Sequence, residues 1–243
     1  MNDGTAVFTI ENAAAPGPAV LVCEHASNAF PLPWGTLGLT GEQRRAHIAW
    51  DPGALDLARA LARDLGAPLI AGGLSRLIYD LNRPPDAPSA MPERSEIHNV
   101  PGNRDLPRAE RWRRTERIYL PFHAALSGLL ARRLAGGQKP VLITVHSFTP
   151  VWHGTPREVE FGVIHDADDR LARAIAGGAT GLVTRLNQPY SAADGVAHTL
   201  ALHATPMGLR NAMLEIRNDL IAQGAQEMAA RLAPVLRSAM GAV

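Results

Sequence analysis

The stretch PAVLVCEH, residues 18–25, decides the fold class. Five consecutive apolar residues follow a proline and end at a glutamate and a histidine. An unbroken apolar run of this length is typical of a strand whose two faces are both buried, as in sheets covered by helices. The stretch therefore predicts a buried strand that carries Glu24 and His25 at its end.

Further apolar runs and helical patterns alternate along the rest of the chain. Strands are predicted at residues 68–71, 74–81, 140–145, 159–164 and 209–216. Helices are predicted at residues 51–66, at 108–134 with a kink at Pro121, at 168–176 and at 220–240. This alternation predicts an α/β sheet, and because no linker or repeat interrupts it, residues 1–243 are expected to form a single domain.

The composition excludes several classes of protein. The chain has 243 residues, with 24 Lys and Arg against 23 Asp and Glu, and one cysteine. The near-neutral charge argues against nucleic-acid or acidic-membrane partners, and one cysteine excludes a disulfide scaffold or a Cys-rich zinc module. There is neither a signal-peptide pattern nor a stretch of about 18 apolar residues, so a cytoplasmic protein is expected. The oligomeric state is left open.

Polar residues follow the predicted strands at the points where the strands end. Glu24 and His25 end the first strand, His146 follows residues 140–145, and Glu215 lies near the end of the last strand. Asp80-Leu-Asn82-Arg83 ends the run at 74–81. Ligands of open α/β sheets bind outside the carboxyl ends of the strands, so these side chains are expected to meet around one crevice.

Two histidines that each leave a buried strand could bind zinc, but a catalytic site needs a third protein ligand. Asp51 and Glu24 are candidates, and His123 and His203 are weaker ones. Asp51 precedes Pro52 at a helix start, so it is equally well explained as a helix N-cap.

Three other features each allow two interpretations. Glu215 stands in an apolar run and is either ion-paired, for example with Arg217, or a general base. Asn82 and Arg83 would suit a small acidic molecule, unless Asp80 pairs with a neighbouring arginine and simply fixes a loop. Residues 84–107 contain six prolines and are expected to form a long irregular loop, which in a compact domain is often a lid or a binding loop.

The motifs as a set resemble the N-formylglutamate amidohydrolase family over nearly the whole chain, from about Val20 to Leu220. The motifs are His25, Asp51, Ser75-Arg-Leu-Ile-Tyr-Asp-Leu-Asn-Arg-Pro84, Pro121-Phe-His123, Val145-His-Ser147 and Leu214-Glu215. The resemblance implies a three-layer sandwich with a central mixed sheet, similar to zinc carboxypeptidases and aspartoacylases. It also implies one catalytic zinc per chain and cleavage of N-formyl-L-glutamate to formate and glutamate, a late step of histidine breakdown.

The resemblance also implies roles for individual residues. His25 and His146 match metal ligands, Glu215 matches the general base, and Asn82 with Arg83 match the pair that holds a substrate carboxylate. Relatives of the carboxypeptidase type have a glutamate three residues after the first histidine, where this chain has Asn28. Asp51 is therefore the expected third ligand.

The expected mechanism assigns the remaining charges. Arg76 is the candidate partner of the tetrahedral oxyanion. Arg83 and either Arg217 or Arg104 would bind the two carboxylates of the substrate, and Tyr190 would donate a hydrogen bond.

Two departures from the family pattern keep other functions open. They are the segments Asn187–Gly195 and Glu215–Asp219. The alternatives are a zinc amidase or carboxypeptidase acting on another N-acyl amino acid or small peptide, and a noncatalytic carboxylate-binding protein on the same fold.

Overall fold

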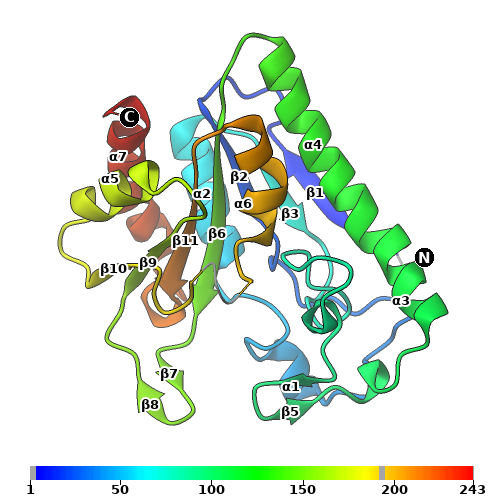
Figure 1. Ribbon diagram of the computed structural model, residues 1–243. Helices are drawn as coiled ribbons and strands as arrows, with labels where there is room; N and C mark the ends of the chain where they lie inside the picture. Colours follow the sequence, from blue (N-terminus) through cyan, green and yellow to red (C-terminus); the bar gives the residue numbers. More distant parts are fainter. Residues whose placement is uncertain (1–3, 192–194, 243) are drawn as a thin grey trace.

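The strand predicted from PAVLVCEH is β2 (Ala19–Cys23), and all five of its residues are buried. In the computed structural model, which describes residues 4–191 and 195–242, β2 belongs to a mixed seven-stranded sheet of order β1-β3-β2-β6-β11-β9-β10 (Figure 1). The other strands are β1 (Phe8–Glu11), β3 (Leu69–Gly72), β6 (Val141–Phe148), β9 (Phe161–Ile164), β10 (Thr184–Leu186) and β11 (Asn211–Arg217). The strands predicted at 18–23, 68–71, 140–145, 159–164 and 209–216 are confirmed.

The strand directions bring one set of strand ends together. β3, β2, β6 and β11 run parallel to one another, while β1 and β9 are antiparallel to their neighbours β3 and β11. The carboxyl ends of β2, β6 and β11 therefore lie at the same edge of the sheet.

Helices cover both faces of this sheet. They are α1 (Gly41–Arg45), α2 (Ala54–Leu65), α3 (Arg108–Arg114), α4 (Leu120–Ala135), α5 (Arg170–Gly178), α6 (His198–His203) and α7 (Ala225–Ala242). Apolar residues of α2, α5 and α7 form one core with the sheet, and those of α4 and α6 form the other. Figure 1 shows α4 on one side of the sheet and α5 and α7 on the other. The molecule is thus a three-layer α/β structure, as expected.

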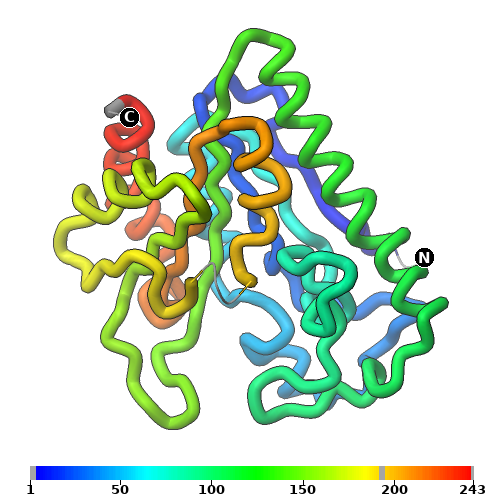
Figure 2. Tube along the Cα trace, viewed as in Figure 1, coloured from blue at the N-terminus to red at the C-terminus, as the bar shows by residue number. Residues whose placement is uncertain are grey.

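Two hairpins extend beyond the edge of the sheet at which the carboxyl ends of β2, β6 and β11 lie. Figure 2 traces the chain from β6 through the hairpin β7 (Val151–Trp152) and β8 (Thr155–Pro156) and back to β9. The other hairpin, β4 (Arg94–Ser95) and β5 (His98–Asn99), lies within the proline-rich segment 84–107. That segment is therefore not wholly irregular, because it also contains the short helical turns η1 (Pro88–Ala90) and η2 (Pro101–Asn103).

One prediction of secondary structure was wrong. Residues 74–81 form turns instead of a strand, and the Ser75 hydroxyl donates a hydrogen bond to the carbonyl of Ala49 there, at 2.8 Å. The apolar side chains of this segment are buried in the core beside α4, so its apolar character reflects burial without sheet pairing.

The helix predicted at 108–134 forms as one uninterrupted helical run, in which a π turn, η3 (Thr115–Tyr119), joins α3 to α4. Pro121 lies two residues after this turn. Proline has no N–H to donate, and the wider turn accommodates the missing hydrogen bond.

No helix among the described residues is both long enough and apolar enough to cross a membrane. Of the segment Asn187–Gly195, whose sequence departs from the family pattern, residues 192–194 lie outside the described part.

Candidate active site

Three neighbouring parallel strands position the predicted site residues. His146 on β6 and Glu215 on β11 are direct partners in the strand register, so their side chains leave the same face of the sheet. His25 follows β2, on the other side of β6. All three side chains are buried, and together they line one cavity.

Asp51 completes this group from the start of α2. The N-cap of α2 is Gly53, at φ 80°, and not Asp51. The carboxylate of Asp51 turns toward the histidines, with Oδ2 2.8 Å from Nδ1 of His146 and 3.3 Å from Nδ1 of His25. The side chain of Asp51 therefore faces the histidines instead of capping the helix.

His25, Asp51 and His146 could together hold a metal ion. Each offers one ligand atom, and these atoms lie within 4.8 Å of one another. Two imidazole nitrogens and one carboxylate oxygen are a ligand set that suits zinc. Glu24, His123 and His203, the other candidates for a third ligand, do not belong to this group.

Each histidine of this group has a second carboxylate on its other nitrogen. Nε2 of His25 lies 2.7 Å from Oδ1 of Asp80, and Nε2 of His146 lies 3.1 Å from Oε2 of Glu24. Metal-binding histidines commonly donate their second N–H to such a carboxylate, which fixes the ring and leaves the first nitrogen for the metal. The surroundings of both rings thus match those of metal ligands.

The charges of the group also fit a cation. Burial alone would raise the pKa of Asp51, but His25 and His146 lower that pKa below its ordinary value. Burial likewise opposes the charge of His146, yet Glu24 and Asp51 raise its pKa well above the ordinary value. The buried carboxylates therefore draw positive charge to the position where a metal ion would be held.

Glu215 differs from these carboxylates because no cation within the described ranges forms an ion pair with it. Its Oε2 atom is buried without a hydrogen-bond partner among the described residues. Burial raises the pKa of Glu215 to about 7, and the charge of Asp51 adds to this effect. A carboxyl group with such a pKa can exchange a proton near neutral pH, as a general base must.

Arg76 lies between two of the buried carboxylates and lines the cavity. Its NH2 atom is 2.7 Å from Oδ2 of Asp80, and its NH1 atom is 3.4 Å from Oδ1 of Asp51. Much of its charge is therefore offset by the protein itself. Asp80 does pair with an arginine, as one interpretation expected, but it also contacts His25.

Asn82 and Arg83 line the same cavity on the side of the 195–199 segment. Asn82 donates to the carbonyl of Val196 and accepts from the N–H of Thr199, so its amide mainly holds this segment in place. Arg83 donates from NH1 to the carbonyls of Asn82 (2.8 Å) and Gly195 (3.1 Å). Within the described part of the chain, no carboxylate forms an ion pair with Arg83.

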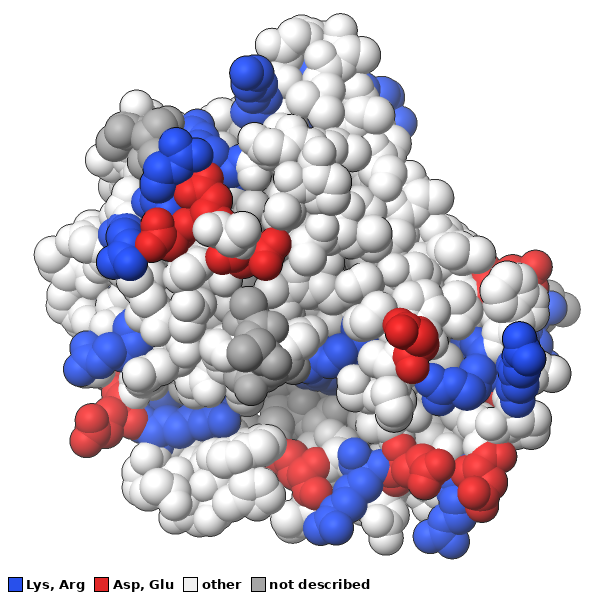
Figure 3. Space-filling view, in the orientation of Figure 1, with Lys and Arg blue, Asp and Glu red and all other residues white. Residues whose placement is uncertain are grey.

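The cavity has a volume of about 260 Å³ and opens at the edge of the sheet. Its lining includes Trp152 from the β7–β8 hairpin and Ser95 and Glu96 from the β4–β5 hairpin, together with Phe148 at the end of β6, His47 and Tyr190. Figure 3 shows that this face of the molecule is hollowed, with basic side chains at the margin of the hollow. The space accommodates a small molecule.

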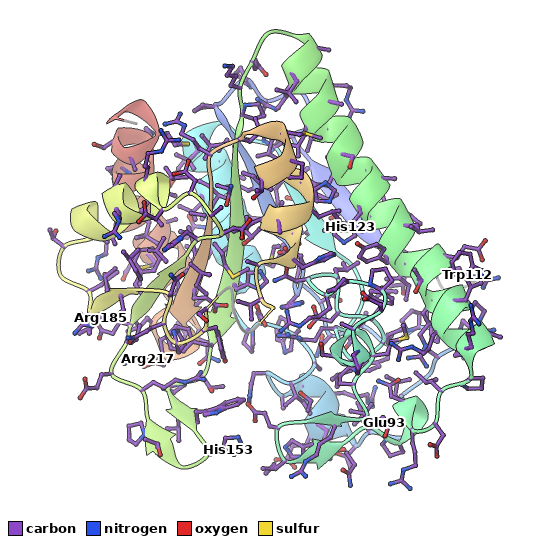
Figure 4. The ribbon with its side chains drawn as sticks, viewed as in Figure 1. Glu93, Trp112, His123, His153, Arg185 and Arg217 are labelled. Carbon is purple, nitrogen blue, oxygen red and sulfur yellow. The ribbon has the colours of Figure 1, made fainter. Side chains whose placement is uncertain are left out.

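Arg217 and Arg104, the two candidates for a second carboxylate contact, do not line this cavity. Arg217 contacts Oδ1 of Asp219 at 2.9 Å and the carbonyl of Arg157 at 3.1 Å, and Figure 4 shows it near Arg185. Arg104 is exposed.

A second group of histidines is buried away from the metal-ligand candidates. Nδ1 of His123 on α4 lies 2.7 Å from Nε2 of His203 on α6, and Nε2 of His123 lies 2.9 Å from the carbonyl of Leu81 (Figure 4). Burial lowers the pKa of His123 to about 3 and that of His203 to about 4. Both rings are therefore neutral and pack the two helices against the loop that holds Asp80 and Asn82.

Sequence reasoning missed Phe148 and Trp152, which line the cavity, and Arg157, which packs against them from behind the lining. Arg157 contacts Tyr190, but it follows a hairpin beyond the end of β6, so neither periodicity nor a strand end marks it. The sequence contained one indication that Glu24 supports a histidine, namely a carboxylate next to a histidine at the end of an otherwise apolar strand.

Comparisons with known proteins identify the family of the chain. The family model of N-formylglutamate amidohydrolase matches residues 17–222. A crystal structure of the gene product Atu2144 from Agrobacterium tumefaciens is 51% identical, with a TM-score of 0.96, over 97% of this chain and 95% of that one. N-formylglutamate amidohydrolase from Ralstonia eutropha JMP134 shares the fold at 23% identity, with a TM-score of 0.71, over 97% of this chain and 98% of that one. No curated protein sequence matches the chain. The match over residues 17–222 shows that the chain belongs to the N-formylglutamate amidohydrolase family.

Proposed function

We propose that this protein is a metal-dependent hydrolase of a small N-acyl amino acid, and that it cleaves N-formyl-L-glutamate to formate and glutamate. The observation that carries the proposal is the buried group of His25, Asp51 and His146 with Glu215 beside it in one cavity. Membership of the amidohydrolase family supports amide hydrolysis as the reaction. The two products match a late step of histidine breakdown, which would take place in the cytoplasm.

His25, Asp51 and His146 would hold the metal ion, most simply one zinc per chain. A zinc ion held there supplies a Lewis acid that polarises the amide carbonyl and makes a water molecule more acidic. Nε2 of His25 forms a hydrogen bond with Asp80, and Nε2 of His146 lies within ion-pair distance of Glu24, so that both Nδ1 atoms would remain available for the ion.

Glu215 would move the proton. As a carboxylate it accepts the proton of the attacking water, and as a carboxylic acid it then gives this proton to the nitrogen of the leaving amino acid. Its pKa of about 7 places both forms within reach at neutral pH. Its location beside His146 in the strand register would bring it close to a scissile bond held at the metal position.

The arginines would receive the negative charges of the substrate. Arg83, with no carboxylate partner among the described residues, would bind the α-carboxylate beside Asn82. Arg76, which lines the cavity between Asp51 and Asp80, would contact the oxyanion that forms on the formyl oxygen.

One experiment combines metal analysis with an assay of formate release from N-formyl-L-glutamate. The wild type should contain about one zinc per chain and release formate. His146→Ala should lose both, while Glu215→Gln should keep the metal and lose about 10²–10⁴-fold in kcat. His153→Ala, which changes an exposed histidine on the β7–β8 hairpin, is the matched control and should retain both.

Two results would contradict the proposal. Loss of metal in Glu215→Gln would make Glu215 a ligand. A zinc-loaded wild type that cleaves neither N-formyl-L-glutamate nor other N-acyl amino acids would favour the noncatalytic carboxylate-binding alternative.

A further inference from the structure

Arg157 has an unusual environment for a charged side chain. Its guanidinium carbon lies 5.3 Å from the ring centroid of Phe148, 4.9 Å from that of Trp152 and 5.1 Å from that of Tyr190. Within the residues that the structure describes, no carboxylate forms an ion pair with it. The cation is thus held by aromatic faces, and these three aromatic side chains all line the cavity.

The polar contacts of Arg157 concentrate on one hydroxyl group. Both NH1 and NH2 donate to the Tyr190 hydroxyl oxygen at 3.2 Å, and NH1 also approaches the carbonyl of Thr149 at 3.4 Å. The backbone of Arg157 is fixed as well, because its N–H donates to the carbonyl of Pro150 at 2.8 Å. The guanidinium therefore holds Tyr190 in one orientation.

This contact determines which hydrogen bond the hydroxyl of Tyr190 can still form. A phenolic hydroxyl has one donor and can accept two hydrogen bonds, and Arg157 supplies both of those. Burial and the nearby charge of Glu215 raise the pKa of Tyr190 despite the opposing effect of Arg157, so the hydroxyl keeps its proton at neutral pH. The O–H is left to donate to a group in the cavity, and the adjacent guanidinium strengthens it as a donor.

We infer that Arg157 is a positioning residue that fixes Tyr190 as the hydrogen-bond donor for the side-chain carboxylate of the substrate. This inference rests on the proposed function. A dianionic substrate needs two cationic contacts, and among the described arginines that line the cavity Arg76 is paired with Asp51 and Asp80. Arg83 accounts for one carboxylate, and Arg157, acting through Tyr190, accounts for the other.

The test compares N-formyl-L-glutamate with N-formyl-L-glutamine, which has nearly the same shape and no side-chain charge. The zinc-loaded wild type should prefer the glutamate derivative in kcat/KM. Tyr190→Phe and Arg157→Gln should each reduce this preference by about 10- to 100-fold, mainly through KM for the glutamate derivative. The double variant should lose no more than Tyr190→Phe alone, because both changes remove one interaction.

Two further variants separate positioning from general disruption. Arg157→Lys keeps the charge without the two-pronged contact, so it should restore part of the preference. Arg185→Gln removes an exposed arginine that lines the same surface hollow as Arg157, outside the cavity, and should leave the preference unchanged. Calorimetric binding of L-glutamate and L-glutamine, the first a product, gives a second readout that does not depend on turnover.

The possible results separate this inference from the proposed function. A wild type that cleaves both derivatives equally well would overturn the inference and leave the proposed function intact. If Tyr190→Phe and Arg157→Gln lowered kcat equally for both derivatives, Tyr190 would act at the reacting centre, and this result would also overturn the inference. A wild type that cleaves neither derivative would overturn both.

Discussion

Nε2 of His146 lies 3.1 Å from the carboxylate of Glu24, the residue that immediately precedes His25 in the chain. One strand end thus provides a candidate ligand, His25, and the carboxylate that orients a different candidate ligand on the neighbouring strand. Glu24 is 1% exposed, and its carboxylate is kept ionised by His146, which lowers its pKa although burial alone would raise it. A buried charge of this kind requires a partner of opposite sign.

The first prediction concerns this support of the histidines. Glu24→Gln and Asp80→Asn each remove the negative charge behind one imidazole, and each should weaken zinc binding by about 10- to 100-fold. A competition titration of the metal-free protein against a chromophoric chelator measures the change. Glu93→Gln, on the exposed part of the proline-rich segment, is the control. If Glu24→Gln kept the zinc affinity of the wild type while Asp80→Asn bound zinc more weakly, only His25 would depend on such a carboxylate.

The second prediction concerns the pH dependence of stability. The pKa of Glu215 is raised from 4.5 to about 7, so the folded protein holds this proton more tightly than the unfolded chain does. The contribution of Glu215 to stability is therefore fully present below pH 4.5 and is lost as the pH rises to about 7. Glutamine has no proton to lose. In the metal-free protein, the free energy of unfolding of Glu215→Gln should thus increase by about 3 kcal/mol relative to that of the wild type as the pH rises from 4.5 to 8.

Denaturant unfolding of the wild type and of Glu215→Gln at several pH values measures this difference in the free energy of unfolding. Comparison with the wild type cancels the titration of the other buried groups, which both proteins share. A difference that stays constant across this pH range would mean that Glu215 has an ordinary pKa, and its assignment as the general base would lose its main electrostatic support.

The third prediction concerns Gly162, which lies opposite Glu215 in the antiparallel pair of β9 and β11. A Cβ atom at Gly162 would lie 2.0 Å from the carbonyl oxygen of Gln188 and 3.2 Å from Cβ of Glu215. Gly162→Ala must therefore displace the backbone two residues before Tyr190. We expect a loss of about 1–3 kcal/mol in unfolding free energy, together with a lower kcat/KM.

Gly177→Ala is the matched control for this change. Gly177 lies in α5, where an added Cβ would contact nothing within 4 Å. This variant should be as stable as the wild type or more stable by up to about 1 kcal/mol, with unchanged activity. If Gly162→Ala had the same free energy of unfolding as the wild type, the backbone of Gln188 would be able to move aside without loss of stability.

The central strands could be predicted because buried parallel strands leave a strong mark in the sequence. β2, β6 and β11 are runs of apolar residues, and their polar ends marked His25, His146 and Glu215 before any contact was known. The edge strands β1 and β10 were missed, since they are short and only partly buried. The strand expected at 74–81 was wrong because an apolar run indicates burial and does not distinguish a strand from buried turns.

The walls of the cavity could not be predicted in the same way. Trp152 comes from a hairpin that extends beyond the sheet, and Arg157 directly follows this hairpin. Arg217 was expected in the cavity although its neighbours Asp219 and Glu160 hold it outside. Such positions depend on how hairpins and loops pack after the sheet has formed. The sequence pattern that reveals a strand end carries no information on this packing.

The order of the strands also has a consequence for how the chain acquires its structure. β11 is the last strand to be synthesised, yet it lies between β6 and β9 in the finished sheet. Until residues 211–217 leave the ribosome, β6 and β9 each have an unpaired edge and cannot join through their common neighbour. Exposed strand edges of this kind promote association with other chains. Glu215 arrives on this same last strand, so the candidate active site is completed only when the sheet itself closes.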